Sequence, residues 1–249
     1  MAEVTVHAVV LRRRDMGESD RRLTLLTKER GVIDVTAKGA RKGGSRLSGS
    51  SEPLSACILQ LATGKRNQYV TQAQPISSFP GLRTDYDRLS YALALTELAA
   101  AVLPHEHPAD EEFGFLVRAL HDLEHHEKPL VALIWAQLKL MDMSGFLPSF
   151  DVCVLTGVPV GEALPFLSPH AGGYIAFDSA VGFTDRFQTR AEVLYGLSAC
   201  QEIDEPPPNL KFASECFRAL FPFWRAYAEK QLPANEAIAM QLTASPRPE

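Results

Sequence analysis

The chain has 249 residues, of which 46% are hydrophobic and 22% are charged, and its formal net charge is -5. This composition is typical of a globular protein and excludes a disordered chain, which buries too little apolar surface to fold. The sequence has no apolar run of about 18 residues, so we expect neither a membrane span nor a membrane partner. Acidic Glu3 precedes the basic run Arg12 to Arg14, which reverses the charge order of a secretory signal, so we expect a cytoplasmic protein.

The charge is distributed unevenly along the chain. Residues 1–80 carry 13 Lys+Arg and 7 Asp+Glu, a net charge of +6, whereas the remaining residues carry 12 and 23, a net charge of -11. A basic module followed by an acidic body indicates a polyanionic partner for the first part and a different partner for the second.

The first 76 residues show short β-type segments separated by turn residues. Apolar residues alternate with polar ones in most of these segments, which is the period of a half-buried strand. The five segments are VTVHAVVLR, RRLTLLTK, GVIDVTAKG, LSACILQLA and QYVTQAQPI. Five short strands in fewer than 80 residues predict a small barrel, and the five-stranded candidate is the OB-fold.

After Pro80 and Gly81 the apolar period changes to that of helices. We expect one helix from Tyr86 to a stop at Pro104, a second through Phe113 to Leu123, and a third from Pro129 to Gly145. Three consecutive helices predict a bundle.

The remaining chain is less regular. Residues 146–190 are rich in Pro and Gly and predict a compact loop or small β insertion. The segment PPPN at 206–209 precedes a last amphipathic helix with its apolar stripe from Leu210 to Tyr227. After Leu232 the pattern weakens, and we expect ASPRPE at 244–249 to be a frayed tail. The predicted class is therefore α+β, with an OB-fold domain at 1–79 and a helical domain at 80–249.

The strongest functional signal is the set of cations on the β module. Glycines in KGARKGGSRL at 38–47 let a basic loop bring backbone N–H groups close to phosphates. The segment is no P-loop, because Ser45 follows Gly44 where that motif needs Lys. A solvated surface remains the alternative to DNA binding. The predicted DNA-contacting residues are Arg12, Arg13, Arg14, Arg21, Arg22, Lys38, Arg41, Lys42, Arg46, Lys65 and Arg66, with Tyr69 for base stacking.

Two other functions are kept as alternatives. In HDLEHH, His121 and His125 have the four-residue spacing of two metal ligands on one helix face, so a metal-dependent hydrolase using them with Glu124 is one alternative. The simpler interpretation is a solvated helix face, and we predict no metal, no cofactor, no catalytic residue and no small-molecule substrate. A pure protein adaptor, whose basic patch meets an acidic peptide, is the other alternative.

The stretch VVLRRRDMGESDRRLTLLTKERGVIDVTAKGARKGGSRLSGSSEPL resembles the N-terminal signature of the RecO family of recombinational repair proteins. In that signature a GE-S-D turn precedes a strand and an AKGAR-x-x-x-SR segment follows. A later segment, LKLMDMSGFLPSFDVCVLTG, is similar to the family's helix, Gly-x-x-Pro turn and first zinc-ligand motif. The resemblance spans about the first 180 residues.

This resemblance implies an N-terminal OB-fold, a helical bundle and a small zinc-finger-like element. It further implies a recombination mediator that binds single- and double-stranded DNA, anneals complementary strands and helps load recombinase onto DNA coated with single-strand binding protein. The implied partners are RecR and the acidic C-terminal tail of that binding protein, and the implied location is cytoplasmic and nucleoid-associated.

The sequence departs from the family in the zinc element. Its two CxxC pairs correspond here to Cys153 with Thr156 and Ala176 with Ser179, so three of four thiolates are missing. We expect the element at 146–190 to persist without metal. The side chains expected to hold it together are Phe166, Tyr174, Ile175 and Phe177, and the first candidate for a residual ligand is His170.

Overall fold

The computed structural model describes residues 3–64, 67–161 and 164–244. It separates into two compact units, Met1–His125 and His126–Glu249. Within the described ranges, no helix combines the length and the apolar character needed to cross a bilayer. The predicted domain boundary between residues 79 and 80 stays a prediction, and the first two helices fall in the same compact unit as the β module.

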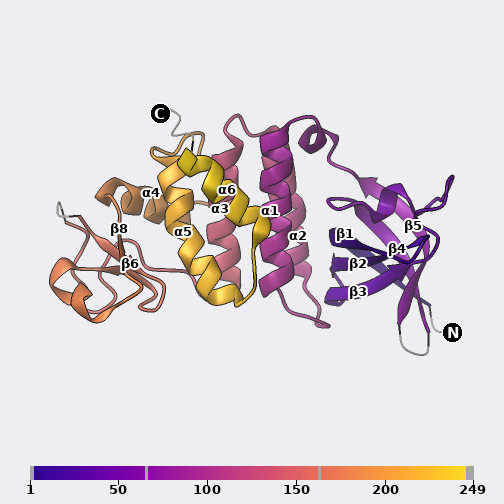
Figure 1. Ribbon diagram of the computed structural model, residues 1–249, viewed down its shortest axis with the longest axis horizontal. Coiled ribbons are helices and arrows are strands. Elements are labelled where there is room, and N and C mark those ends of the chain that lie inside the picture. Colours follow the sequence, from indigo (N-terminus) through magenta and orange to yellow (C-terminus); the bar gives the residue numbers. More distant parts are fainter. Residues whose placement is uncertain (1–2, 65–66, 162–163, 245–249) are drawn as a thin grey trace. The chain divides into compact units, whose positions relative to one another are not determined.

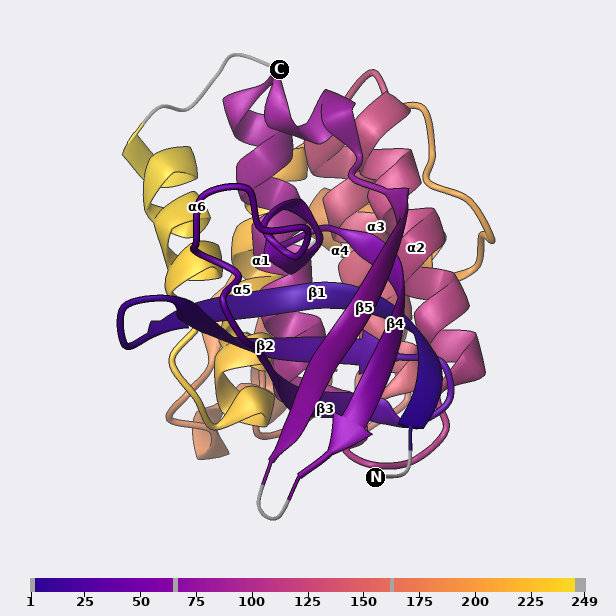
Figure 2. The same cartoon turned by 90° about the vertical axis from the view of Figure 1, so that its right-hand side faces the viewer.

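The first unit contains a closed five-stranded barrel (Figures 1 and 2). Its strands are β1 (Glu3–Met16), β2 (Asp20–Thr27), β3 (Gly31–Ala37), β4 (Ala56–Thr63) and β5 (Gln68–Ser77). They are joined in the order β1-β2-β3-β5-β4, with β3 and β5 parallel and the other pairs antiparallel. The barrel confirms the predicted OB-like fold and, with the helices that follow, the α+β class.

Alternating apolar side chains fill the barrel. The interior cluster includes Val6, Ala8, Val10, Leu23, Leu25, Ile33, Val35, Leu59 and Leu61. Val9 and Leu26 lie outside this cluster and are nonetheless fully buried. The helices α1 (Tyr86–Val102) and α2 (Asp110–His125) contact β1 and β2, so part of the outer barrel face is covered as well. This double burial explains why the segment Ala8 to Val10 is apolar without alternation.

The described part of the second unit contains four α-helices. They are α3 (Pro129–Met143), α4 (Ala191–Gln201), α5 (Ala213–Ala228) and α6 (Pro233–Ala244). Helix α5 packs against α3, α4 and α6, around the fully buried Trp135, Phe217 and Trp224. The expected third helix is confirmed. The sequence pattern weakens after Leu232 and did not predict α6, and the tail expected at 244–249 lies outside the described residues except for Ala244, which ends α6. Helix α4 was not anticipated.

A small three-stranded sheet lies inside the predicted element at 146–190. Its strands, β6 (Phe166–Ser168), β7 (Gly173–Ile175) and β8 (Phe187–Gln188), are ordered β7-β6-β8. Tyr174 and Ile175 are buried as expected. Phe177 follows β7 at the start of the short helix η3 (Phe177–Gly182) and is 63% exposed, so it is not part of the buried core of the element as expected. Its ring contacts the element at Phe166, with ring centroids 5.9 Å apart.

Candidate nucleic-acid interface

A row of polar side chains crosses four strands on the outside of the barrel. The register pairs Arg14 with Arg22, Arg22 with Thr36, and Thr36 with Tyr69. Paired residues in neighbouring strands project from the same face of a sheet. Lys38 extends the row, since its Nζ lies 4.0 Å from the centre of the Tyr69 ring, within range of a cation–π interaction. We call Arg14, Arg22, Tyr69 and Lys38 the outer row.

A β-bulge in β1 determines which arginines face outward. The β1–β2 register shifts between Val10 and Arg12. Val10 points into the barrel, and simple alternation would therefore turn Arg12 and Arg14 inward as well. The extra residue reverses the alternation, so that Arg13 pairs with interior Leu23 while Arg12 and Arg14 are exposed.

The inward-facing cations form an ion-pair network at one end of the barrel. Arg21 is 8% exposed, and its Nη1 donates to Ser51 Oγ at 2.7 Å and lies 3.0 Å from Glu52 Oε1. Arg13 Nη1 lies 2.8 Å from the same Glu52 oxygen. Asp15 pairs with Arg21 at 3.7 Å and with Arg41 at 3.4 Å. The guanidinium groups of Arg13, Arg21 and Arg41 are thus already engaged by carboxylates.

The glycine-rich segment at 38–47 is held as a series of turns. Asp20 Oδ1 accepts a 2.8 Å hydrogen bond from the Gly39 N–H, and the Arg41 N–H donates to the Ser19 carbonyl at 2.9 Å. The Gly39 N–H is the main cause that lowers the pKa of Asp20, followed by the Ser19 hydroxyl and then the charges of Lys38 and Lys42. The segment is therefore fastened at its start, while Lys42 to Gly44 are exposed.

The twelve predicted contact residues divide into three groups. Those that are exposed are Arg12, Arg14, Lys38, Arg41, Lys42 and Arg46, and those half-buried or buried are Arg13, Arg21, Arg22 and Tyr69. Within the described residues, no carboxylate lies within ion-pair distance of Arg12, Arg14, Lys42 or Arg46. Lys65 and Arg66 lie outside the described residues.

A polar groove of about 530 Å³ lies beside the outer row. Its lining includes Arg22, Arg30, Asn67 and His105. His105 reaches this place because it bridges to Gly31 and Val32 at the start of β3. Nothing in the sequence indicates that residue 105 contacts a strand more than seventy positions earlier, so His105 was not predicted.

The histidines of the alternative hydrolase function are brought together on α2. His121, Glu124 and His125 place potential ligand atoms within 4.8 Å of one another. Among the described residues, this is the one such group of three or more His, Cys, Asp or Glu side chains, and it does not include His170 or Cys153.

The zinc-finger-like element does not fit a zinc ion. Cys153 supplies one sulfur, and this Sγ accepts a hydrogen bond from the Ala176 N–H at 3.2 Å. Burial alone would raise the pKa of Cys153, but hydrogen bonds from Thr156, Ala176 and Leu155 outweigh it and lower that pKa. Thr156, Ala176 and Ser179 offer no soft anionic ligand, so the element lacks the ligand set that a zinc ion requires.

Comparison with known proteins identifies relatives along most of the chain. The family model described as recombination protein O N terminal matches residues 1–79, and the one described as recombination protein O C terminal matches residues 83–236. The two matches meet close to the end of the barrel strands.

Individual relatives carry the name DNA repair protein RecO. The protein from Heliobacterium modesticaldum is 41% identical over 172 residues, covering 68% of this chain and 62% of the relative. Those from Bifidobacterium animalis and Anaeromyxobacter dehalogenans are 37% and 32% identical, covering 70% and 81% of this chain and 72% and 80% of the relative. The matched part of this chain thus spans less than two thirds of the Heliobacterium protein's length. With both family models matched in order, this chain belongs to the RecO family of recombination proteins.

Proposed function

We propose that this protein is a recombination mediator that binds single- and double-stranded DNA and anneals complementary strands. Membership of the RecO family supports a role in DNA repair and recombination. In this proposal the protein also helps load recombinase onto DNA coated with single-strand binding protein. It acts without cleaving a covalent bond, so it is no enzyme.

The observation that carries the proposal is the outer row on β1, β2 and β5, with Lys38 directly after β3. OB-folds bind oligonucleotides on the face of strands 2 and 3 and with the loops that join strands 1 to 2 and 4 to 5. Arg22 lies on that face, with Arg14 and Tyr69 beside it in register. Cations there can meet phosphates, and the Tyr69 ring offers a surface for one base.

The chemistry of annealing requires only that phosphate charge is screened. Two strands held against exposed guanidinium and ammonium groups repel each other less, so base pairing proceeds without ATP. In this proposal Arg12, Arg14, Arg22, Lys38, Lys42 and Arg46 contact phosphates. Arg13, Arg21 and Arg41 instead position the loops, because their guanidinium groups donate hydrogen bonds to the loop residues Glu52, Ser51 and Gly17.

RecR and the acidic C-terminal tail of single-strand binding protein are the proposed protein partners, at the nucleoid. In the adaptor alternative the basic surface binds the acidic tail, so the tail and DNA would compete for the same cations. In the mediator proposal the tail and DNA bind to separate surfaces. Titration of a DNA complex with a peptide of that tail distinguishes these two cases. Release of DNA indicates a shared surface, whereas a ternary complex indicates separate surfaces and favours the mediator.

The test replaces three members of the outer row together, Arg14→Ala, Arg22→Ala and Lys38→Ala. The measurements are single-strand binding at several salt concentrations and annealing of two oligonucleotides coated with single-strand binding protein. Each lost phosphate contact lowers the slope of log K against log salt by about 0.7 for single strands, so the triple variant should lose about 2. Annealing should fall toward the uncatalysed rate.

A charge-matched control removes three exposed cations elsewhere, Arg118→Ala, Lys211→Ala and Lys230→Ala. It should anneal like the wild type. Equal loss in both triple variants would mean that total charge rather than the outer row matters, and an unchanged slope in the outer-row variant would exclude that face as the DNA site.

A further inference from the structure

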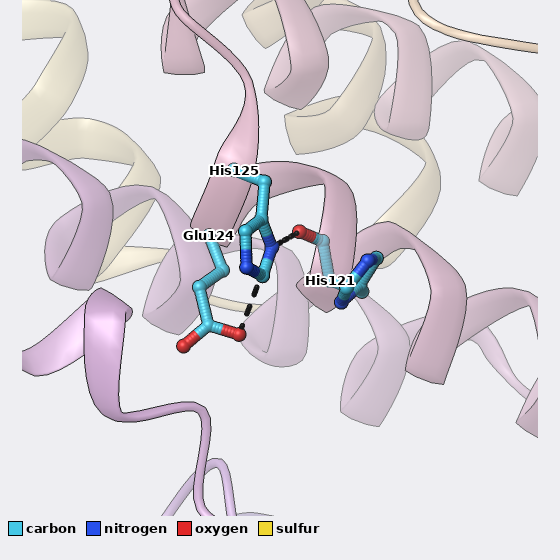
Figure 3. A group of neighbouring side chains, drawn as sticks. All are labelled: His121, Glu124 and His125. Atoms are coloured by element: carbon cyan, nitrogen blue, oxygen red, sulfur yellow. Dashed lines mark hydrogen bonds and ion pairs between the residues drawn. The ribbon is translucent and has the colours of Figure 1, made fainter.

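Three potential metal ligands converge at the C-terminal end of α2. His121, Glu124 and His125 follow the i, i+3, i+4 spacing that brings side chains to one helix face. Their ligand atoms all lie within 4.8 Å of one another (Figure 3). Two imidazoles and a carboxylate form a ligand set that divalent transition metals bind.

The backbone fixes the tautomer of one imidazole. His125 Nδ1 lies 2.9 Å from the His121 carbonyl oxygen, as drawn in Figure 3. A carbonyl oxygen only accepts hydrogen bonds, so Nδ1 carries the hydrogen and Nε2 of the neutral ring keeps its lone pair. Histidine ligands in metal sites have this arrangement, in which the second nitrogen donates to a carbonyl and orients the ring.

The two imidazoles can reach a common ion. The ring centroids of His121 and His125 are 4.3 Å apart, with an angle of 41° between the ring planes. Both residues are at the surface, and the His125 side chain is 60% exposed. Around a tetrahedral ion with bonds of about 2.1 Å the ligand atoms are about 3.4 Å apart, so a small rotation of these exposed rings closes the site.

The carboxylate is already held in place. The Glu124 side chain is 10% exposed, and its Oε1 accepts a 2.6 Å hydrogen bond from the Gly81 N–H. Its other oxygen, Oε2, lies 3.9 Å from the His125 imidazole, measured to Nδ1, and remains available to an ion that Nε2 binds. Since one oxygen is anchored, the second can ligate an ion with little further loss of side-chain entropy.

We propose that His121, Glu124 and His125 bind one divalent transition-metal ion of the Zn²⁺, Co²⁺ or Ni²⁺ type, with water completing its coordination. Mg²⁺ and Ca²⁺ are poor occupants because they prefer oxygen ligands. Glu124 accepts a hydrogen bond from Gly81 in the short helix η2 (Pro80–Arg83), which follows β5. The ion therefore joins the end of α2 to the segment that leaves the barrel, and it stabilises the first unit.

The experiment is a titration of the whole protein with Co²⁺, followed by visible and near-ultraviolet absorption. Binding of one equivalent without a thiolate-to-cobalt charge-transfer band is expected, because the ligands are nitrogen and oxygen. His121→Ala and His125→Ala should each weaken binding at least tenfold. Zn²⁺ should compete with Co²⁺ and raise the melting temperature of the wild type but not of these variants.

Three further variants make the result specific. Glu124→Gln keeps an acceptor for the Gly81 N–H and removes the charge, so it should fold normally and bind more weakly. His107→Ala removes another exposed histidine and should bind like the wild type. Cys153→Ser should also bind normally. No saturable binding, binding retained by both α2 histidine variants, or binding lost in Cys153→Ser would each overturn the proposal.

Discussion

At the residue scale, the pairing of Arg22 limits what the outer row can do. Arg22 Nη2 lies 3.3 Å from Asp34 Oδ2, and Asp34 Oδ1 also accepts from the Thr24 hydroxyl at 2.8 Å. A carboxylate beside proposed phosphate contacts repels DNA and occupies a guanidinium. Asp34→Asn keeps the acceptor for Thr24 and removes the charge. We expect about 2- to 5-fold tighter binding of single-stranded DNA at low salt, and a smaller gain at 0.2 M salt, where the Debye length is shorter.

The matched control is Glu111→Gln, which removes one exposed negative charge on α2 instead of on the barrel face. Equilibrium binding of a labelled oligonucleotide measures both variants. An equal gain in DNA affinity in the two variants would be an effect of net charge. Weaker DNA binding by Asp34→Asn would show that the Asp34 carboxylate supports the DNA site.

The sequence identifies the cations of the barrel, but it does not show which of their side chains face outward. Composition and the KGARKGGSRL segment identify a basic module, and no sequence pattern separates Arg12 and Arg14 from Arg13. The bulge after Val10 determines which arginines face outward, because one extra residue moves the following side chains to the opposite face of the strand. Arg21 is similar, since its burial depends on Ser51 and Glu52 about thirty residues later.

At the element scale, Gly31 connects the barrel to the segment that follows α1. Its φ is +61°, and an added Cβ would collide with the carbonyl oxygens of Pro104 and His107. The Val32 N–H donates to the same Pro104 carbonyl at 2.9 Å. Gly31→Ala should therefore lower the free energy of unfolding by about 1 to 2 kcal/mol because of the left-handed backbone, and by a further 1 to 3 kcal/mol because of the collision.

Gly44→Ala separates these two contributions. Gly44 has φ +73° and open space around its missing Cβ, so this variant should show only the backbone cost of about 1 to 2 kcal/mol. Urea unfolding followed by circular dichroism measures both variants. Equal losses of stability in the two variants would mean that the 104–107 segment moves away from the added methyl group at no energetic cost.

Helices α1, α2, α3 and α5 were predicted from their apolar period, whereas α6 was missed because polar contacts anchor it. Only Asn235 and Ile238 of α6 are buried. Asn235 Oδ1 accepts from Gln137 Nε2 at 3.1 Å, and Gln137 Oε1 accepts from Trp224 Nε1 at 3.2 Å. A buried amide network leaves no apolar stripe in the sequence, so a pattern of hydrophobic residues cannot reveal it.

At the scale of the whole molecule, the barrel and the first two helices form one compact unit. Val9 and Leu26 are fully buried although they lie outside the barrel interior, and α1 and α2 contact the strands that carry them. A barrel without these helices would expose that apolar face. The smallest part that folds independently should therefore be residues 1–125 rather than residues 1–79.

The last prediction compares two fragments with the full chain. Fragment 1–125 should melt in one cooperative transition and bind single-stranded DNA within about threefold of the full chain, because it carries every residue of the outer row. Fragment 1–79 carries the same cations, yet it should aggregate or melt without cooperativity, since each fully buried apolar side chain that becomes exposed costs about 1.5 to 3 kcal/mol. Cooperative melting of fragment 1–79 would show that α1 and α2 are dispensable for the barrel.

A folded fragment 1–125 that no longer bound DNA would place an essential part of the interface in residues 126–249. Those residues carry 9 Lys+Arg and 14 Asp+Glu, so their net charge gives no electrostatic reason to expect DNA binding there.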